Sequence, residues 1–308
     1  MPSQLPPDTD SLPLIENGTR PPNFWARAKE IASYRELLGN LTRRDLKIRY
    51  KNSILGVFWT LLNPLLYLVI FSIVFSLILR NGAPRYGLLL LSGLLVFNLF
   101  STGLSSATTS ILGNGPLVQK VWFPREILPL ATILSTLVTF VFQATILLAG
   151  LAVFGQSPEW SMIWLLIPAM AATLALTTGF ALLLSVLNVY YRDVQHFLEL
   201  GLLAWFWITP IVYQYDFMAI TLTEKWGEGA EKLTLLNPMI PVVVTFQRVL
   251  YNPTNFDEEA QSKFFSEILQ PTSWYLQNLA VSLAVGLFMI FVGFKVFTRL
   301  EANLGEEL

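Results

Sequence analysis

The sequence predicts an all-α integral membrane protein with six transmembrane helices, an N-terminal amphipathic interfacial helix and external re-entrant half-helices. Three observations predict this class. Of the 308 residues, 54% are hydrophobic and only 13% are charged, whereas soluble domains carry about 25% charged residues. Six apolar runs approach or exceed the roughly 20 residues that a helix needs to cross a bilayer core. A further apolar stretch is too short to cross.

Composition also excludes several classes of function. A net charge of −1 and a pI near 5.9 exclude the basic surface of a nucleic-acid-binding protein. Without cysteine the chain has no thiolate metal site and no disulfide. It also lacks the Gly-x-x-x-x-Gly-Lys-Ser/Thr phosphate loop. We therefore expect no cofactor or metal in this chain. If the chain does vectorial work, the energy must enter from a partner protein.

The N-terminal region divides into a tail and an interfacial segment. Residues 1–23 are rich in Pro, Asp and Ser without periodicity, which predicts a disordered tail. Over residues 24–52 apolar side chains recur at helical spacing beside a basic surface, which predicts one amphipathic helix or a pair lying under the bilayer. A helix of a small soluble domain is the alternative, but about 30 residues are too few to bury a core.

The transmembrane domain is expected over residues 53–298. The predicted spans are 54–79, 88–108, 130–154, 162–187, 197–214 and 276–298. Pro64 in the first span predicts a kink or a tilt. Ser101, Ser105 and Thr109 give the second span a small residue at every fourth position, which permits close contact between helices in lipid.

Basic residues predict which loops face the cytosol. Six spans put both termini on one side. That side holds nine basic residues before the first span, two in the 109–129 loop, one in the 188–196 loop and two at the C-terminal end. The two short loops on the other side hold only Arg80 and Arg85. Positive charge is enriched in cytoplasmic loops, so both termini, including the tail 299–308, are expected in the cytoplasm.

The loop 215–275 is long and acidic, and we expect it to face outward. Within it, a turn at 237–241 opens a second apolar stretch, Val242 to Tyr251, that is too short to cross the bilayer. A half-helix that dips back beside the fifth span explains this stretch. An apolar helix in a small external domain is the alternative.

The spans contain almost no ionisable residue. Glu199 and Lys295 lie at the margins of the fifth and sixth spans, and no charged residue lies deeper. Ion-coupled transporters usually place ionisable groups at mid-bilayer, so this chain has no such relay. The single histidine, His196, is interpreted as a structural or solvated residue.

The cytoplasmic loop 109–129 is a candidate docking element. It carries an apolar knob formed by Leu117, Val118, Val121, Trp122 and Phe123. The knob is flanked by the charged residues Lys120, Arg125 and Glu126, and is followed by Pro124 and Pro129. Such a knob suits a groove in a partner ATPase. A connector packed on its own bundle is the alternative.

Three stretches carry a resemblance to a known family: RRDLKIRYKNSILGVFWTLLNP at 43–64, LVQKVWFPREILP at 117–129 and NVYYRDVQHF at 188–197. The sequence resembles the permease subunit of type-2 ABC exporters for polysaccharides and polyol phosphates, which move lipid-linked O-antigen, capsule and teichoic acid chains. The resemblance implies a homodimer in the bacterial inner membrane, with the pore between the two permeases. It also implies two copies of a separate nucleotide-binding ATPase, which would bind ATP and Mg²⁺.

The resemblance also implies roles for individual residues. Arg44, Asp45, Arg49 and Tyr50 would belong to the interfacial helix. The loop that contacts the ATPase would contain Lys120, Phe123, Pro124, Arg125 and Glu126, and the exposed-knob argument adds Trp122.

Aromatic residues mark a candidate path for a glycan. Tyr67, Phe71 and Phe75 recur at every fourth position of the first span, and Trp205, Trp207 and Tyr213 lie in the fifth. Sugar rings pack their C–H faces on aromatic rings without charge. Aromatic residues in membrane helices also face lipid or the protein core, so that alternative applies to each of the six.

These observations favour the membrane subunit of an ATP-driven exporter of a lipid-linked glycan. A drug or small-lipid exporter of the same superfamily is the alternative. An integral membrane glycosyl- or acyltransferase is more remote, because the chain offers no catalytic His or paired carboxylates at the membrane surface.

Overall fold

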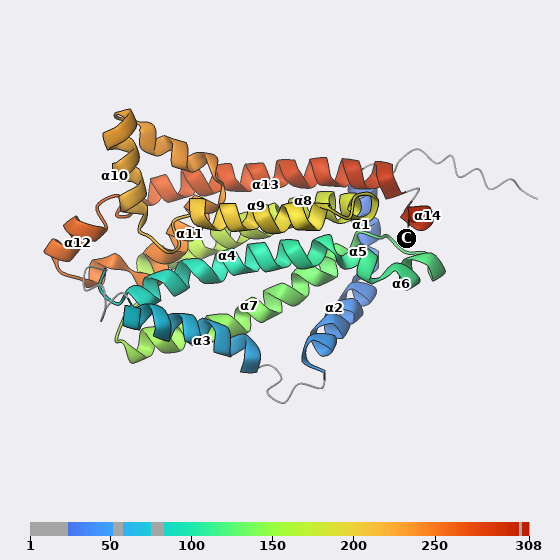
Figure 1. Ribbon diagram of the computed structural model, residues 1–308, viewed down its shortest axis with the longest axis horizontal. Coiled ribbons are helices and arrows are strands. Elements are labelled where there is room, and N and C mark those ends of the chain that lie inside the picture. The colour runs from blue at the N-terminus through green and yellow to red at the C-terminus, as the bar shows by residue number, and fades with distance from the viewer. Residues whose placement is uncertain (1–23, 52–57, 75–82, 302–303, 308) are drawn as a thin grey trace, which may run out of the picture.

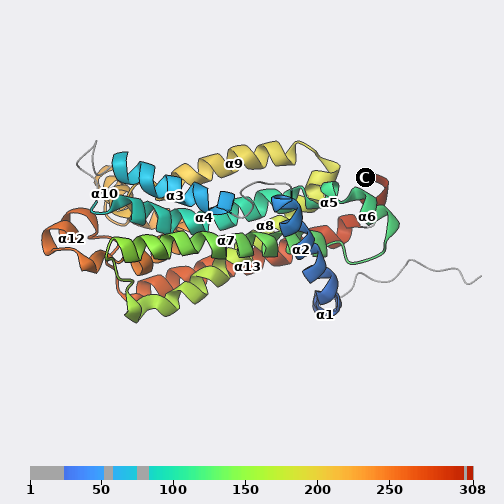
Figure 2. The same ribbon diagram turned by 90° about the horizontal axis from the view of Figure 1, so that it is seen from below.

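The structure is a computed structural model, and it describes residues 24–51, 58–74, 83–301 and 304–307. Every regular element in these ranges is a helix. The long helices run side by side along the long axis of the molecule, and short helices gather at its two ends (Figures 1 and 2). Near-continuous apolar sequence without long β-branched runs gives helices that are hydrophobic on all sides, as burial in protein and lipid requires.

Four helices are long and apolar enough to cross a membrane. They are α4 (Tyr86–Thr108), α7 (Ile127–Val153), α8 (Leu166–Tyr190), which continues the 3₁₀ turn η3 (Trp160–Leu165), and α13 (Thr272–Leu300). Most of α4 is buried, whereas only about a third of the spanning window of α7 and 28% of that of α13 are buried. The bundle is therefore built around α4, and α7 and α13 offer apolar surface to the bilayer.

Two shorter helices occupy the positions of the predicted first and fifth spans. These are α3 (Phe58–Ser72) and α9 (Val194–Ile208). The predicted range 54–79 extends into residues that the structure does not describe, and Pro64 lies buried inside α3. The fifth helix ends at 208 and not at 214 because Thr209, which precedes Pro210, is extended. Six membrane crossings remain a prediction.

The closest helix pair is α8 with α13, and glycines make it possible. A Cβ atom on Gly179 would lie 2.6 Å from the backbone of Met289 and Ile290. A Cβ on Gly286 would lie 2.8 Å from the Leu176 nitrogen. Small residues let two backbones approach closely in lipid. A larger side chain at either glycine would separate α8 from α13.

Short elements divide between the two ends of the bundle (Figure 1). One end carries α1 (Phe24–Ser33), α2 (Arg35–Tyr50), α5 (Ser110–Gly113), α6 (Gly115–Lys120) and α14 (Leu304–Glu307). The other carries α10 (Tyr215–Trp226), η4 (Ala230–Leu236) and α12 (Glu258–Phe264). The predicted interfacial segment thus forms a pair of helices. The predicted tail 1–23 lies outside the described residues.

The short apolar stretch forms a bent half-helix. The segments Ala230–Leu236 and Met239–Asn255 meet at 98°. Every residue of α11 (Met239–Phe246) is buried, and the helix contacts α4, α8 and α13. It therefore lies inside the bundle, as expected of a half-helix, and not in a separate external domain.

Candidate coupling site and translocation surface

A buried arginine joins three distant parts of the chain. The Arg27 Nε in α1 lies 2.9 Å from one carboxylate oxygen of Glu126, and Nη2 lies 3.1 Å from the other. The same Nη2 lies 2.6 Å from both oxygens of Glu301, which follows α13. Arg27 is only 7% exposed and Glu126 is fully buried. We call Arg27, Glu126 and Glu301 the clasp.

The clasp holds one positive charge between two negative ones. Burial by itself lowers the pKa of Arg27, but the hydrogen bond and charge of Glu126, with the charge of Glu301, raise it above its usual range. Burial, and then the charge of Glu126, raises the pKa of Glu301. Removing one member would leave the remaining buried charges with an incomplete set of partners. The clasp therefore fixes α1, the start of α7 and the end of α13 relative to one another.

Arg125 strengthens the same junction from the surface. Its Nη1 donates to the backbone oxygen of Glu301 at 2.6 Å. The Tyr190 hydroxyl at the end of α8 donates to the backbone oxygen of Leu300 at 2.7 Å. The end of α13 is thus bonded to the loop before α7 and to α8.

The predicted interfacial-helix residues all lie on α2, and two of them connect it to the bundle. Arg44 pairs with Asp45 at 3.0 Å and donates to the Asn114 Oδ1, between α5 and α6, at 2.7 Å. Arg49 donates to the Thr139 Oγ1 of α7 at 2.9 Å. Tyr50 lines a cleft together with Val138 and Phe142 of α7. These bonds connect α2 to α7 and to the α5–α6 turn.

The loop between α4 and α7 exposes a short tip. The backbone becomes extended at Val121, directly after α6. Lys120, Val121 and Trp122 are exposed, and the exposed fraction of Trp122 is 74%. We call Lys120, Val121 and Trp122 the tip. The tip lies at the same end of the molecule as α1, α2 and the clasp (Figure 1).

Most other members of the predicted knob are buried, while Leu117 and Arg125 are half-buried. Phe123 is 4% exposed and packs with Val118 in a cluster that includes Ile127 and Phe297. Pro124 is also buried. The sequence-predicted coupling residues therefore divide by role: Lys120 and Trp122 face outward, Phe123 and Pro124 support the loop, and Arg125 and Glu126 bind α1 and α13.

Two of the predicted aromatic residues line a cleft between α3, α4 and α9. The cleft has a volume of about 310 Å³. Tyr67 and Phe71 of α3 line it with ring centroids 6.1 Å apart, and Phe206 lines it from α9. Asn98 and Ser101 of α4 add polar groups to its wall. Phe75, the third aromatic predicted on the first span, lies outside the described residues.

The predicted aromatic residues of the fifth span do not share one surface. The Trp205 Nε1 donates to the Asn237 Oδ1 at 2.7 Å, and the ring packs on Phe100 with centroids 5.0 Å apart. Trp207, two residues on and thus on the opposite side of α9, is exposed. The Tyr213 hydroxyl donates to the Trp207 backbone oxygen at 2.9 Å. Trp205 therefore holds the half-helix turn, while Trp207 is free to face lipid or a second subunit.

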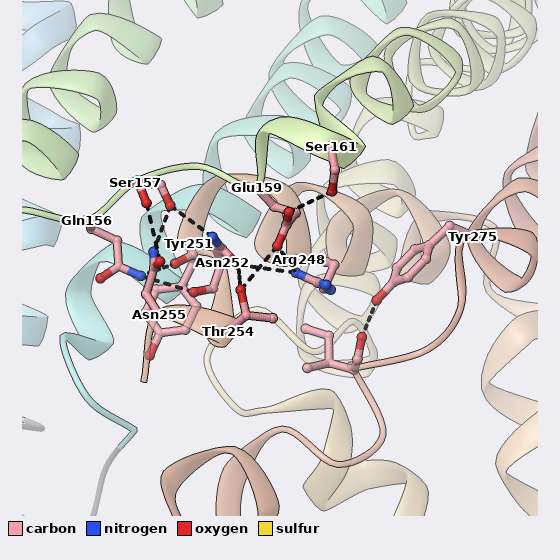
Figure 3. A network of polar contacts seen from close by, with 11 residues as sticks. Gln156, Ser157, Glu159, Ser161, Arg248, Tyr251, Asn252, Thr254, Asn255 and Tyr275 are labelled. Atoms are coloured by element: carbon pink, nitrogen blue, oxygen red, sulfur yellow. Dashed lines mark hydrogen bonds and ion pairs between the residues drawn. The ribbon is translucent and has the colours of Figure 1, made fainter. Parts of the chain in front are cut away.

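A polar network fastens the half-helix at the opposite end of the molecule from the clasp (Figure 3). Asn252 has a φ of +50° and donates from Nδ2 to the Ser157 backbone oxygen at 3.1 Å. Gln156 Nε2 donates to the Asn252 backbone oxygen at 3.1 Å, and Asn255 Nδ2 donates to the Ser157 backbone oxygen at 2.7 Å. Asparagine tolerates the left-handed conformation that this turn requires. The chain after α7 and the end of the half-helix are thereby joined.

An ion pair completes the network in Figure 3. The Arg248 Nη1 lies 3.5 Å from the Glu159 carboxylate, and Arg248 is buried. The hydrogen bond from Ser161 is the main cause that lowers the pKa of Glu159, and the bond from Thr254 and the charge of Arg248 act in the same direction against burial. Glu159 therefore stays ionised and balances the buried charge of Arg248.

Sequence reasoning missed several residues of these sites. It counted Arg27 with the basic surface of the interfacial helix, and it did not identify Glu301, Gln156 or Asn252. Arg27 and Glu301 are 274 positions apart. No local pattern links them, because only the folded bundle brings the ends of the chain together.

Comparisons with known proteins identify the family. Residues 36–226, more than half of the chain, match the model of the ABC-2 type transporter family. An O-antigen export system permease protein RfbA of Klebsiella pneumoniae is 27% identical over 89% of this chain and 95% of its own length. The protein of that name from Myxococcus xanthus is 32% identical over 72% of this chain and 83% of its own length. The polysialic acid transport protein KpsM of Escherichia coli is 25% identical over 65% of this chain and 75% of its own length.

The matched segment contains part of the elements described above, and leaves out the half-helix and the Arg27 and Glu301 members of the clasp. It runs from α2 through the tip and the α3–α4–α9 cleft to the end of α10. Members of such a family are membrane permeases that work with an ATPase subunit. With its apolar bundle and this match, the chain is a multi-pass membrane permease that belongs to the ABC-2 type transporter family.

Proposed function

We propose that this chain is the channel-forming subunit of an ATP-driven exporter that moves a lipid-linked polysaccharide of the O-antigen or capsule class out of the bacterial cytoplasm. Two copies form the channel, and two copies of a separate ABC ATPase hydrolyse ATP on the cytoplasmic side. The observation that carries this proposal is the match, over 89% of the chain, to a permease named for O-antigen export.

The arrangement of the tip and the clasp supports a route for coupling. The exposed Trp122 offers a large apolar side chain to a groove in the ATPase, and Lys120 beside it offers a charge. Glu126, four residues after Trp122, belongs to the buried clasp. A displacement of the tip is therefore passed to α1, α7 and α13 together.

The aromatic cleft supports a neutral, extended substrate. Tyr67 and Phe71 offer ring faces, and the cleft wall contains the small polar groups of Asn98 and Ser101 but no charged side chain. Sugar rings pack on such faces through their C–H edges, and many weak contacts allow a chain to slide. Two copies of the chain would bring two such surfaces to one pore.

The termini are assigned to the cytoplasm by the distribution of positive charge. The clasp, the tip and the basic helix α2 lie at one end of the bundle, where an ATPase would dock (Figure 1). The acidic elements α10 and α12 and the half-helix turn then lie on the external side of the inner membrane.

Stimulation of ATP hydrolysis distinguishes this function from drug export. The permease and its ATPase, reconstituted together in liposomes, are expected to hydrolyse ATP faster with a polyprenyl-diphosphate-linked glycan than with hydrophobic drugs. Stimulation by drugs alone would contradict glycan export. Turnover of a glycosyl or acyl donor by the purified permease without ATPase would instead support a transferase.

A further inference from the structure

A second cleft lies where α2 meets α7, apart from the clasp and the tip. It has a volume of about 470 Å³, within the range of about 300–1,000 Å³ that small-molecule sites occupy. The cleft is lined by Leu46, Lys47, Tyr50, Lys51, Val138 and Phe142. The first four lie on α2 and its C-cap, and the last two on α7.

One wall of this cleft is cationic. Lys47 and Lys51 are four residues apart and so lie on the same face, and Arg43 precedes them on that face by one more turn. None of the three forms an ion pair with any residue that the structure describes. Asp45, the nearest acidic residue in the sequence, is paired with Arg44 at 3.0 Å. The positive charge at the cleft is therefore not neutralised by any acidic residue in the described part of the chain.

The opposite wall is apolar and continues onto the lipid-facing surface. Val138 and Phe142 form it, and Val141 and Leu148 extend an exposed apolar strip farther along α7. The helix α7 is long and apolar enough to cross the membrane. The hydrogen bond from Arg49 to Thr139 holds the two walls together at this point. A cationic rim thus meets apolar surface partway along α7, between its start at Ile127 and its end at Val153.

We propose that this cleft binds an anionic phospholipid of the cytoplasmic leaflet. The headgroup phosphate lies against Lys47 and Lys51, and an acyl chain follows Val138 and Phe142 along α7. A soluble anion would not pack on the apolar wall, and a neutral lipid would not pair with the lysines. Basic side chains beside a membrane helix attract anionic lipid by charge. A lipid held there stabilises α2 against α7, independently of the exported substrate.

Native mass spectrometry of the full-length permease in detergent tests this site. The probe is a titration with phosphatidylglycerol, compared with phosphatidylcholine of the same acyl chains. We expect phosphatidylglycerol to be retained in preference to phosphatidylcholine. Because each basic residue near the surface contributes about 1 kcal/mol, Lys47→Gln with Lys51→Gln should weaken phosphatidylglycerol binding roughly 30-fold.

A charge-matched control separates a built site from general attraction. Lys29→Gln with Arg35→Gln removes the same charge from exposed positions on α1 and α2 outside the cleft, and it should leave affinity nearly unchanged. Val138→Trp fills the cleft without changing charge and should also reduce binding. Thermal unfolding shows whether each variant folds. If Val138→Trp does not fold, Val138→Phe takes its place.

Several results would overturn the proposal. They are equal loss of binding in the two charge-removal pairs, equal retention of both phospholipids, and unchanged binding when Val138 is replaced by a larger residue. Competition by inorganic phosphate alone would indicate a soluble anion. Stronger binding of a polyprenyl diphosphate would assign the cleft to the exported substrate's carrier. The measurement needs neither the ATPase nor the glycan, so its outcome is independent of the proposed transport function.

Discussion

At the scale of single residues, we expect buried charged side chains to affect the stability of this permease more than exposed ones. Arg27, Glu126, Arg248 and Asp216 are all nearly or fully buried. Three of them are paired with an opposite charge, and among the described residues Asp216 has no such partner. The free energy of burying each charge depends on the partners that the charge has in the folded protein. The stability of the two ends of the molecule should therefore respond strongly to single substitutions.

Asp216 makes stability depend on pH. Its Oδ1 accepts from the Glu267 backbone nitrogen at 2.6 Å, while its Oδ2 is buried without a hydrogen-bond partner among the described residues. Burial raises the pKa of Asp216 to about 6 from 3.8. Because the folded pKa is above the unfolded one, the folded state binds more protons between these values. Stability is therefore lost as pH rises from about 4 to 6, by roughly 3 kcal/mol in total.

The variant Asp216→Asn removes this cost. We expect it to unfold at a higher temperature than the wild type at pH 7.5, and at nearly the same temperature at pH 4, as measured by thermal unfolding in detergent. Asp193→Asn, at an exposed position, is the control and should show no such difference. A pH-independent effect of Asp216→Asn would refute an ionised, desolvated carboxylate.

The clasp predicts a non-additive mutant cycle. Arg27→Met and Glu126→Met should each destabilise the protein by about 3–5 kcal/mol, because each leaves a buried charge with an incomplete set of partners. The double variant should be less destabilised than the sum of the singles, since it removes both charges. Thermal unfolding measures the cycle. Glu30→Gln, which touches Arg27 from a half-exposed position, is the control with a small effect.

The sequence predicts some residues of the candidate coupling site and not others. The positions of Arg44 and Arg49 on the interfacial helix follow from local periodicity and family resemblance. Burial of Arg27 and Phe123 depends on contacts with α7 and α13, which are distant in the sequence. Hydropathy is a local property and contains no information about such contacts.

At the scale of elements, helix ends explain where prediction and structure differ. The central parts of α4, α7, α8 and α13 lie where apolar runs predict them, because about 20 apolar residues have few alternatives to a spanning helix. The fifth helix is shorter because of Pro210, and the half-helix bends at Asn237 and Pro238. The tight pairing of α8 and α13 depends on which glycines face each other, and the spacing within one helix does not reveal it.

The turn at the end of the half-helix predicts a graded response at Asn252. Asn252→Gly keeps the backbone conformation at φ +50° but loses the bond to Ser157, so we expect a loss of about 1–2 kcal/mol. Asn252→Val loses the bond and strains the backbone as well, so its unfolding temperature should be lower still. Equal effects of the two variants in thermal unfolding would show that conformation does not matter at this turn.

The tip predicts loss of partner binding without loss of fold. Trp122→Ala should weaken binding to the ATPase by roughly 30-fold, about 2 kcal/mol, as measured by titration of the ATPase onto permease in nanodiscs. Its unfolding temperature should stay close to that of the wild type, because Trp122 is exposed. Trp226→Ala, an exposed tryptophan at the other end of the bundle, is the matched control. If both variants bind the ATPase as the wild type does, the tip is not the docking element.

At the scale of the whole molecule, the two ends are built for different tasks. One end combines the tip, the clasp and the basic helix α2, and the other holds the half-helix rigidly through Asn252 and Arg248 (Figures 1 and 3). Between them lies the aromatic cleft of α3, α4 and α9. A movement that enters at the tip is therefore expected to shift helices at the first end while the half-helix stays fixed.

Translocation itself tests the central claim most directly. Permease and ATPase are reconstituted in liposomes that expose the ATPase, a polyprenyl-diphosphate-linked glycan is added, and its protection from an external glycosidase is measured. We expect protection that requires ATP, is strongly reduced by Trp122→Ala and is unchanged by Trp226→Ala. Protection without ATP, or equal protection with the Trp122 variant, would contradict an exporter driven through the tip.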